Sequence, residues 1–260
     1  MCIVVIKPKG YDIPSKAMLK TCFRENPDGA GIMHAQDGIV NIQKGFMGFR
    51  GFWKYHQDMR FGKRDSIVYH FRIATAGGVS PETSHPFPVS NDLNMLSAVS
   101  SSDTLAVAHN GVIPIKTDKG LSDTMSFIKD IIFPVKSDLL KRKKPIFQLI
   151  ELGTRGSKLA FMYGNGDVIT TGTGWIKEGG LWFSNDSYLD TSWKYNNWNW
   201  SKSLWGTKGN NDERLIESDM YCENCGARLL QYGNEYYCED CDYTASKDYV
   251  GKHAISALWN

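Results

Sequence analysis

The sequence lacks the features that would place a protein in a membrane or carry it across one. No apolar run approaches the roughly 18 residues that a transmembrane helix needs. The N-terminus has no basic segment followed by a long apolar stretch, so no signal peptide is indicated. We therefore expect a cytoplasmic protein with no membrane partner.

The sequence also lacks internal repeats and a strong net charge of either sign. Its net charge is +2, and hydrophobic and charged residues make up 42% and 22% of its 260 residues, an ordinary globular mixture. The charge is nevertheless uneven. Residues 218–260 contain three basic and seven acidic side chains, a net charge of −4, so residues 1–217 carry +6. This length allows one large domain with a small satellite.

Apolar runs, turn signals and helical spacing alternate without a regular strand–helix–strand repeat. This mixture predicts an α+β fold of largely antiparallel sheets. We expect helices at 12–24, 48–59 and 124–133. We expect strands at 1–6, 66–75, 105–108 and 181–184, with hairpins joining 31–35 to 39–43 around Asp37-Gly38 and 158–163 to 167–171.

Cys2 would become the first residue if Met1 were removed, and it would then carry both a thiol and a free α-amine. The reference pKa values of these groups are about 8.5 and about 7.7–8.0. The amine could therefore act as the base that activates the thiol as a nucleophile. The alternative interpretation is a small apolar residue at the start of a buried strand.

Other residues supply groups that a glutamine-cleaving thiol enzyme needs. Arg72 ends a predicted strand and could hold a carboxylate, and Asp123 begins a predicted helix and could hold an ammonium group. Asn110 and Gly111 place an amide donor beside a backbone N–H, as an oxyanion hole requires. Each residue also has an ordinary interpretation: a surface ion pair, a helix N-cap and a hairpin turn, respectively.

Several stretches together carry a resemblance to a known family. They are MCIVV at the start, NPDGAGI at 26–32, HFRIATAG at 70–77, SHPF at 84–87, AHNGVI at 108–113, SDT at 122–124, and the later FMYGNGDV and GLWFSNDSY. Over about residues 1–190 the chain resembles the class II glutamine amidotransferases of the N-terminal-nucleophile hydrolase fold. The resemblance implies a four-layer αββα sandwich of mostly antiparallel sheets, within a domain at 1–217.

The resemblance also implies a reaction and a set of roles. L-glutamine would be hydrolysed to glutamate and ammonia through a thioester on Cys2. Because the chain has no synthase domain, the ammonia would pass to a separate acceptor enzyme; such stand-alone forms also occur in bacteriophage genomes. The implied roles are Cys2 as nucleophile and base, Asn110 and Gly111 as oxyanion hole, and Arg72, Thr75, His85 and Asp123 as substrate-binding residues.

The sequence departs from the family pattern at two positions. Ile3 follows the nucleophile where many members have glycine, which leaves the local geometry beside Cys2 open. Met125 stands where the family's SDTE run has glutamate, but Asp123 of that run is present.

Two Cys-x-x-Cys pairs near the C-terminus predict a zinc ribbon. Cys222, Cys225, Cys238 and Cys241 would form a closed tetrahedral site for a structural Zn²⁺ within 218–246, followed by a tail at 247–260. A hairpin around Gly233-Asn234 should lie between the pairs. Because the surroundings are acidic, we expect a protein partner or a lid role, and direct nucleic-acid binding is the less favoured alternative.

Each of two further segments has two possible interpretations. The basic run at 141–144 is either a solvated helix end or a grip for phosphates. The stretch at 190–212 holds four tryptophans that either pin a long loop onto the domain or stack on a ring-bearing substrate.

Two alternatives to a glutaminase also remain. One is an N-terminal-nucleophile amidohydrolase with another γ-glutamyl or amide substrate. The other is a non-catalytic binding protein that recruits partners through the ribbon.

Overall fold

The chain divides into two compact units, Met1–Asp190 and Thr191–Asn260. The computed structural model describes residues 2–74 and 78–189, together with 216–221, 228–232, 235–237 and 244–246 in the second unit. The domain boundary expected at 217 therefore falls inside the second unit. Thr75, the 190–212 stretch, the four ribbon cysteines and the 247–260 tail lie outside the described residues.

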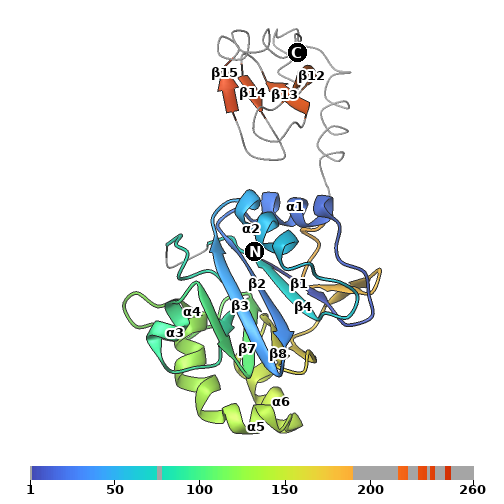
Figure 1. Cartoon of the computed structure of the whole chain (residues 1–260). Coiled ribbons are helices and arrows are strands. Elements are labelled where there is room, and N and C mark those ends of the chain that lie inside the picture. Colours follow the sequence, from blue (N-terminus) through green and yellow to red (C-terminus); the bar gives the residue numbers. More distant parts are fainter. Residues whose placement is uncertain are drawn as a thin grey trace, which may run out of the picture. The chain divides into compact units, whose positions relative to one another are not determined.

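Two antiparallel sheets form the centre of the first unit (Figure 1). The seven-stranded sheet has the order β10-β11-β1-β4-β2-β3-β6, and the four-stranded sheet has the order β5-β7-β8-β9. Their strands are β1 Ile3–Lys7, β2 Ala30–Gln36, β3 Ile39–Phe46, β4 Ile67–Phe71, β5 Phe87–Pro88, β6 Ser100–Asp103, β7 Leu105–Asn110, β8 Lys158–Tyr163, β9 Val168–Thr171, β10 Ile176–Glu178 and β11 Leu181–Phe183.

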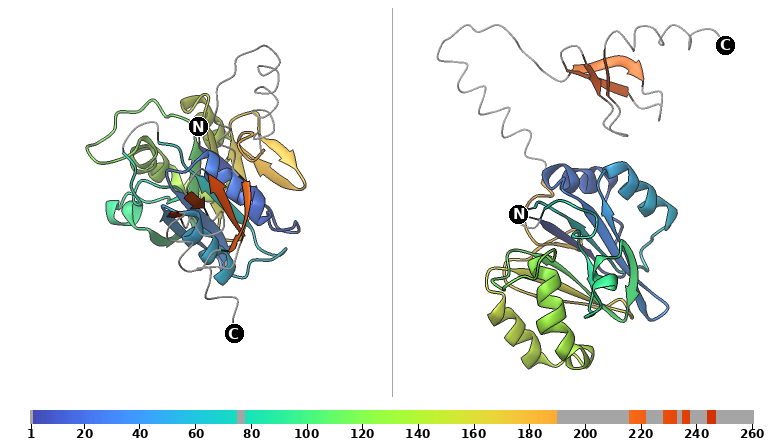
Figure 2. Two further views of the ribbon diagram at one scale, coloured as in Figure 1. Left: turned by 90° about the horizontal axis from the view of Figure 1, so that it is seen from above. Right: turned by 90° about the vertical axis from the view of Figure 1, so that its left-hand side faces the viewer.

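Helices cover the outer faces of both sheets (Figure 2). Leu19 and Phe71 belong to the core between α1, α2 and the larger sheet, whereas Ile128 and Phe161 belong to the core between the smaller sheet and the helices that lie between β7 and β8 in the chain. A third core of side chains from β1, β2, β7 and β8 fills the space between the sheets. The α-helices are α1 Lys16–Glu25, α2 Phe49–Asp58, α3 Leu93–Ser97, α4 Asp123–Phe127, α5 Lys136–Leu140 and α6 Lys144–Gly153, and the π-helix η1 Ile128–Ile132 and the 3-10 helix η2 Phe133–Val135 lie between α4 and α5.

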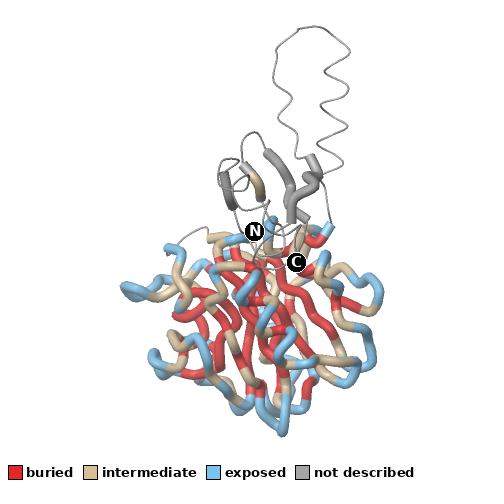
Figure 3. Tube along the Cα trace, turned by 45° about the horizontal axis from the view of Figure 1, so that its top comes forward, coloured by how far each residue is buried: buried red, intermediate tan, exposed pale blue. Residues whose placement is uncertain are grey.

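The resulting order of layers is helix, sheet, sheet, helix. It agrees with the predicted α+β class and is compatible with the predicted sandwich. Figure 3 shows the central strands as the buried part of this unit. Among the described residues, no helix is both long enough and apolar enough to cross a membrane.

Local sequence signals explain several of the observed boundaries. Asp37 and Gly38 join β2 to β3 with φ values of 52° and 79°, as the two central residues of a type I′ turn require. The Ser15 side chain accepts the Met18 N–H at the start of α1, so the helix begins at Lys16 and not at 12. The Ser122 side chain likewise caps α4 by accepting the Met125 N–H.

Other elements differ from the sequence prediction. The strand predicted at 66–75 ends at Phe71; Arg72 N–H still donates to Gly29 O in register, but Arg72 O accepts the Asp28 N–H, one residue out of register, so the regular ladder stops there. The strand β6 is composed of Ser and Asp only, so it gave no apolar signal. The basic run at 141–144 is exposed from the end of α5 to the first residue of α6, which is compatible with both of its interpretations.

The second unit contains a four-stranded antiparallel sheet in the order β12-β13-β14-β15. Its strands are β12 Ile216–Tyr221, β13 Arg228–Tyr232, β14 Glu235–Tyr237 and β15 Thr244–Ser246. Tyr232 pairs with Glu235, so the hairpin predicted around Gly233-Asn234 is confirmed by its flanking strands.

Candidate active site

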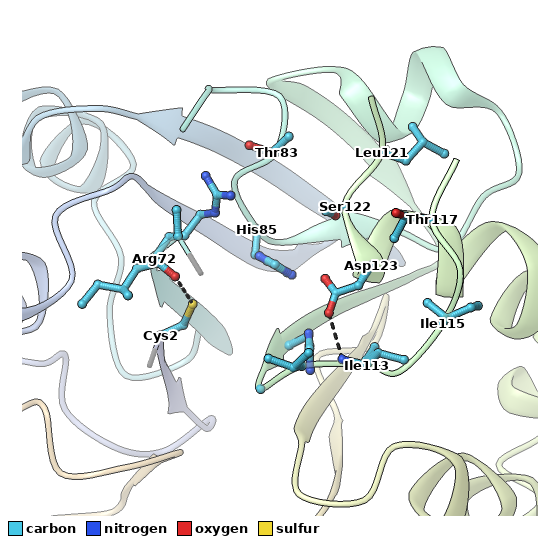
Figure 4. A pocket seen from close by; sticks show the side chains of 15 residues that line it. Cys2, Arg72, Thr83, His85, Ile113, Ile115, Thr117, Leu121, Ser122 and Asp123 are labelled. Carbon is cyan, nitrogen blue, oxygen red and sulfur yellow. Dashed lines mark hydrogen bonds between the residues drawn. The ribbon is translucent and has the colours of Figure 1, made fainter. Parts of the chain in front are cut away.

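A cavity of about 270 Å³ lies at the start of β1, just past the ends of β4 and β7. Cys2, Arg72, His85, Gly111 and Asp123 all line it, although they are far apart in the sequence (Figure 4). The strand order explains the convergence, because β1 pairs antiparallel with β4 and places Ile3 opposite Phe71. Asn110 is buried directly beside Gly111. Thr75 is outside the described residues.

Cys2 is held at the edge of the cavity by its backbone and its thiol. Its Sγ donates to Ile73 O at 3.5 Å, and Asn185 Nδ2 donates to Cys2 O at 2.7 Å. Burial raises the pKa of the Cys2 thiol, and the positive charge of Arg72 opposes part of that rise. The thiol is therefore protonated at neutral pH and needs a base before it can act as a nucleophile.

Arg72 is a buried cation with unused donors. Its side chain is 5% exposed, and Nη2 donates to Gly78 O at 2.7 Å. The buried Nη1 has no hydrogen-bond partner, and no acidic side chain pairs with Arg72 within the described part of the chain. A buried guanidinium is costly without an anion, so the cavity is prepared for an anionic group such as a carboxylate.

The Asn-Pro-Asp-Gly turn fixes the backbone that carries Arg72. Arg72 N–H donates to Gly29 O at 2.8 Å, and Asp28 N–H donates to Arg72 O at 2.9 Å. The Asp28 carboxylate also accepts the Ala74 N–H at 2.8 Å. Gly29 has φ of 126°, and a Cβ there would lie 2.6 Å from Ser84 Oγ, so the turn requires glycine.

Asp123 faces Cys2 from the opposite side of the cavity, with His85 between them (Figure 4). One carboxylate oxygen accepts the Ile113 N–H at 2.8 Å, and the other accepts the Thr124 N–H at 2.8 Å. These bonds orient the carboxylate but leave lone pairs for a further donor. The arrangement can therefore hold an ammonium group.

Asn110 and Gly111 end β7 beside the cavity. Gly111 has φ of 144°, and a Cβ there would lie 2.4 Å from Ser157 Oγ and 2.8 Å from Ser157 Cα. Asn110 is 5% exposed, and its Nδ2 donates to Ser184 Oγ at 2.8 Å. Gly111 therefore lines the cavity together with Cys2, and Asn110 is buried immediately before it in the chain.

Three buried histidines form the back of the site. His85 Nε2 and His109 Nδ1 lie 3.0 and 2.9 Å from Thr124 Oγ1, and His70 Nε2 lies 3.0 Å from His109 O. The rings of His70 and His85 stack with centroids 4.4 Å apart. Burial lowers the pKa of His70 to about 3 and of His109 to about 4, and lowers that of His85 well below its usual value. All three rings are therefore neutral at pH 7.

The sequence motifs alone indicate no role for several residues that contact the site. Ser184 and Asn185 reach Asn110 and Cys2 from the far end of the unit, and Thr124 joins two histidines. Ser184 and Asn185 belong to the GLWFSNDSY motif, which marks them in the sequence. Only the pairing of the strands shows which residues they contact. Ile113, Ile115 and Leu121 form an apolar part of the cavity wall.

No metal site is seen at this cavity. Among the residues that the structure describes, no group of three or more His, Cys, Asp or Glu side chains could hold a metal ion. The predicted ligands Cys222, Cys225, Cys238 and Cys241 lie outside that part of the chain.

Comparison with known proteins adds no assignment. A scan against models of protein families gives no match, and a search of curated proteins gives none either.

Proposed function

We propose that the protein is a glutamine amidohydrolase that uses Cys2 as an N-terminal nucleophile. The observation that carries the proposal is one cavity in which a thiol faces a carboxylate and a buried, unpaired guanidinium. Arg72 and Asp123 are complementary to the two charges of a free α-amino acid. Cys2 would then meet the uncharged side-chain amide, and glutamine is the amino acid that the family resemblance implies.

The chemistry requires that Met1 is removed. The α-amine of Cys2 then takes the thiol proton through one water, and Sγ attacks the amide carbon. Asn110 and the Gly111 N–H stabilise the oxyanion. The amine returns the proton to the leaving nitrogen, ammonia departs, and a thioester remains. Water activated by the same amine breaks the thioester to release glutamate and restore the thiol.

The resemblance supplies the rest of this proposal. The first unit would have the N-terminal-nucleophile hydrolase fold, with the helix–sheet–sheet–helix order as its support. The ammonia would pass to a separate acceptor enzyme, and the second unit would bind a structural Zn²⁺ through its four cysteines. A nucleophilic thiol and thiolate ligands both need reduced cysteines, which favours a cytoplasmic location.

Glutamate release from purified protein tests the activity, and intact mass tests the loss of Met1. Cys2→Ala should abolish turnover. Cys22→Ala is the matched control, because Cys22 is a free cysteine buried in α1 away from the cavity, where burial raises its pKa to about 12. A diazo-ketone analogue of glutamine should label Cys2. Labelling of another residue, or turnover by Cys2→Ala, would contradict the proposal.

A further inference from the structure

Ser184 connects the nucleophile strand to the predicted oxyanion amide. It follows β11 and is 1% exposed. Its Oγ accepts the Val4 N–H at 2.8 Å, and its own N–H donates to Val4 O at 2.9 Å. The same Oγ lies 2.8 Å from Asn110 Nδ2. One hydroxyl therefore joins the backbone two residues beyond Cys2 to the side chain of Asn110.

The hydrogen bonds around Asn110 are incomplete as the amide is oriented. Asn110 Oδ1 is buried and has no donor, and Ser184 Oγ accepts two N–H groups without an acceptor for its own proton, within the described residues. A 180° rotation of the amide resolves both deficits. Ser184 O–H then donates to Asn110 Oδ1 while still accepting the Val4 N–H.

The rotation places Nδ2 where the partnerless oxygen now lies. Two N–H donors would then have no protein acceptor, so they are free for an oxygen of a bound molecule. In the unrotated amide, a carbonyl oxygen occupies that position and would repel a developing oxyanion. The hydroxyl of Ser184 can donate only to the rotated form.

The alternation of side chains along the strands directs this donor and the thiol into the same layer. Val4 and Ala108 face the layer between the sheets. Cys2 lies two residues before Val4, and Asn110 lies two residues after Ala108. Because side chains two residues apart on a strand point to the same face, Cys2 and Asn110 face this layer as well. The neighbours of Asn110, His109 and Gly111, line the cavity that holds Cys2.

We propose that Ser184 is a positioning residue, which holds the Asn110 amide with Nδ2 directed at the carbonyl oxygen of the bound substrate. It touches no substrate itself and moves no proton in the reaction. The inference rests on the proposed glutaminase function. Asn185 complements it, because its Nδ2 fixes Cys2 O at 2.7 Å. Together these two residues set the nucleophile and the oxyanion donor relative to each other.

Steady-state kinetics with glutamine test this role. Ser184→Ala should lower kcat about 10–100-fold, somewhat less than deletion of an oxyanion donor, with KM changed less than about threefold. The affinity for glutamate γ-semialdehyde, whose adduct on Cys2 carries an oxyanion, should fall by a similar factor. Ser184→Cys keeps the packing but offers a weak donor, so it should show the same loss.

Ser66→Ala is the matched control, because Ser66 is also buried but its Oγ has no partner among the described residues and lies outside the cavity. It should keep the wild-type kcat. Asn110→Ala/Ser184→Ala should be no slower than Asn110→Ala alone, since the serine acts through the asparagine. Fully multiplicative losses would overturn the inference.

The outcomes separate this inference from the function on which it rests. A wild-type protein that releases no glutamate overturns both. An active wild type with unchanged kcat in Ser184→Ala and Ser184→Cys overturns only the role of Ser184. Thermal melting of each variant shows whether it is folded. If Ser184→Ala does not fold, Ser184→Cys provides the test.

Discussion

In the proposed function, recognition of the substrate would depend most on the buried guanidinium of Arg72. The protein keeps this cation at 5% exposure with only the Gly78 carbonyl as a side-chain acceptor in the described residues. Such an arrangement costs stability unless an anion is bound. The buried cation therefore lowers the stability of the folded protein, and its anion site is formed before an anion binds.

Arg72→Met should separate binding from stability. We expect KM for glutamine to rise about 100-fold, since a charged hydrogen-bonded pair is lost, while the melting temperature of the free protein does not fall. Steady-state kinetics and calorimetry measure the two effects. Arg142→Met removes an exposed partner of Asp167 and should leave KM unchanged. A marked loss of stability in Arg72→Met would contradict this account.

At Gly111 the space around the backbone leaves no room for the Cβ of any other residue. Gly111→Ala should destabilise the protein by about 2 kcal/mol or more and lower kcat strongly, because the new Cβ meets Ser157 backbone and side chain at φ of 144°. Gly156→Ala is the control, since Gly156 also has positive φ but nothing within 4 Å of a Cβ. Urea unfolding and kinetics compare the two; equal losses would rule out the steric explanation.

At the scale of elements, the cavity depends on side chains that join strands to loops. Lys44 on β3 is one of them: its Nζ donates to Glu82 O at 2.8 Å and Leu96 O at 2.7 Å, and it lies 3.8 Å from the Phe87 ring centroid. It thereby fastens the segment that carries Thr83 and His85 into the cavity wall.

The neutral histidines that join β4, β7 and α4 predict acid sensitivity. Their folded pKa values lie below the usual 6.5, so the unfolded chain binds more protons and stability falls as pH drops from 6.5 toward about 4. Each ring contributes at most about 1.4 kcal/mol per pH unit. His109→Gln should reduce the difference in bound protons between the unfolded and the folded chain by about one, and that slope should fall accordingly.

Urea unfolding at a series of pH values measures the slope. Between pH 7.5 and 8.5 the wild type and His109→Gln should show the same pH dependence, because His109 is neutral in both the folded and the unfolded chain there. An unchanged slope below pH 6.5 would mean that His109 is protonated in the folded protein.

At the scale of the whole molecule, we expect the two units to have different sources of stability. The first has three apolar cores, two of them under helices and one between the sheets. The second is a short four-stranded sheet for which the sequence predicts a metal. Units of that size rarely build a sufficient apolar core, so the proposed Zn²⁺ would supply about 10 kcal/mol or more of folding free energy.

The purified full-length chain should contain about one zinc ion, because four cysteines close one tetrahedral site. Cys222→Ser/Cys225→Ser should lose it, whereas Cys22→Ser, which changes a buried cysteine of the first unit, should not. Elemental mass spectrometry measures the metal. Glutamate release should stay within about twofold of the wild type, since the site binds no substrate. Zinc retained by the double variant would contradict the predicted ligand set.

The sequence by itself determined the local features of this protein. The Asp37-Gly38 hairpin, the Ser122 cap and the strand after Cys2 all follow from interactions between residues close in the chain. Its motifs also pointed to Cys2, Arg72 and Asp123, because each belongs to a short pattern of its own. The polar strand β6 gave no such pattern and was missed.

Only the tertiary structure decided which of these residues meet. Arg72 became a buried cation when β4 paired with β1, with no anionic partner among the residues that the structure describes, and Ser184 reached Asn110 only through the pairing of β11 with β1. These contacts join residues about 70 or more positions apart. Local preferences do not encode such pairings, since they arise from the register of strands and from the burial of their faces.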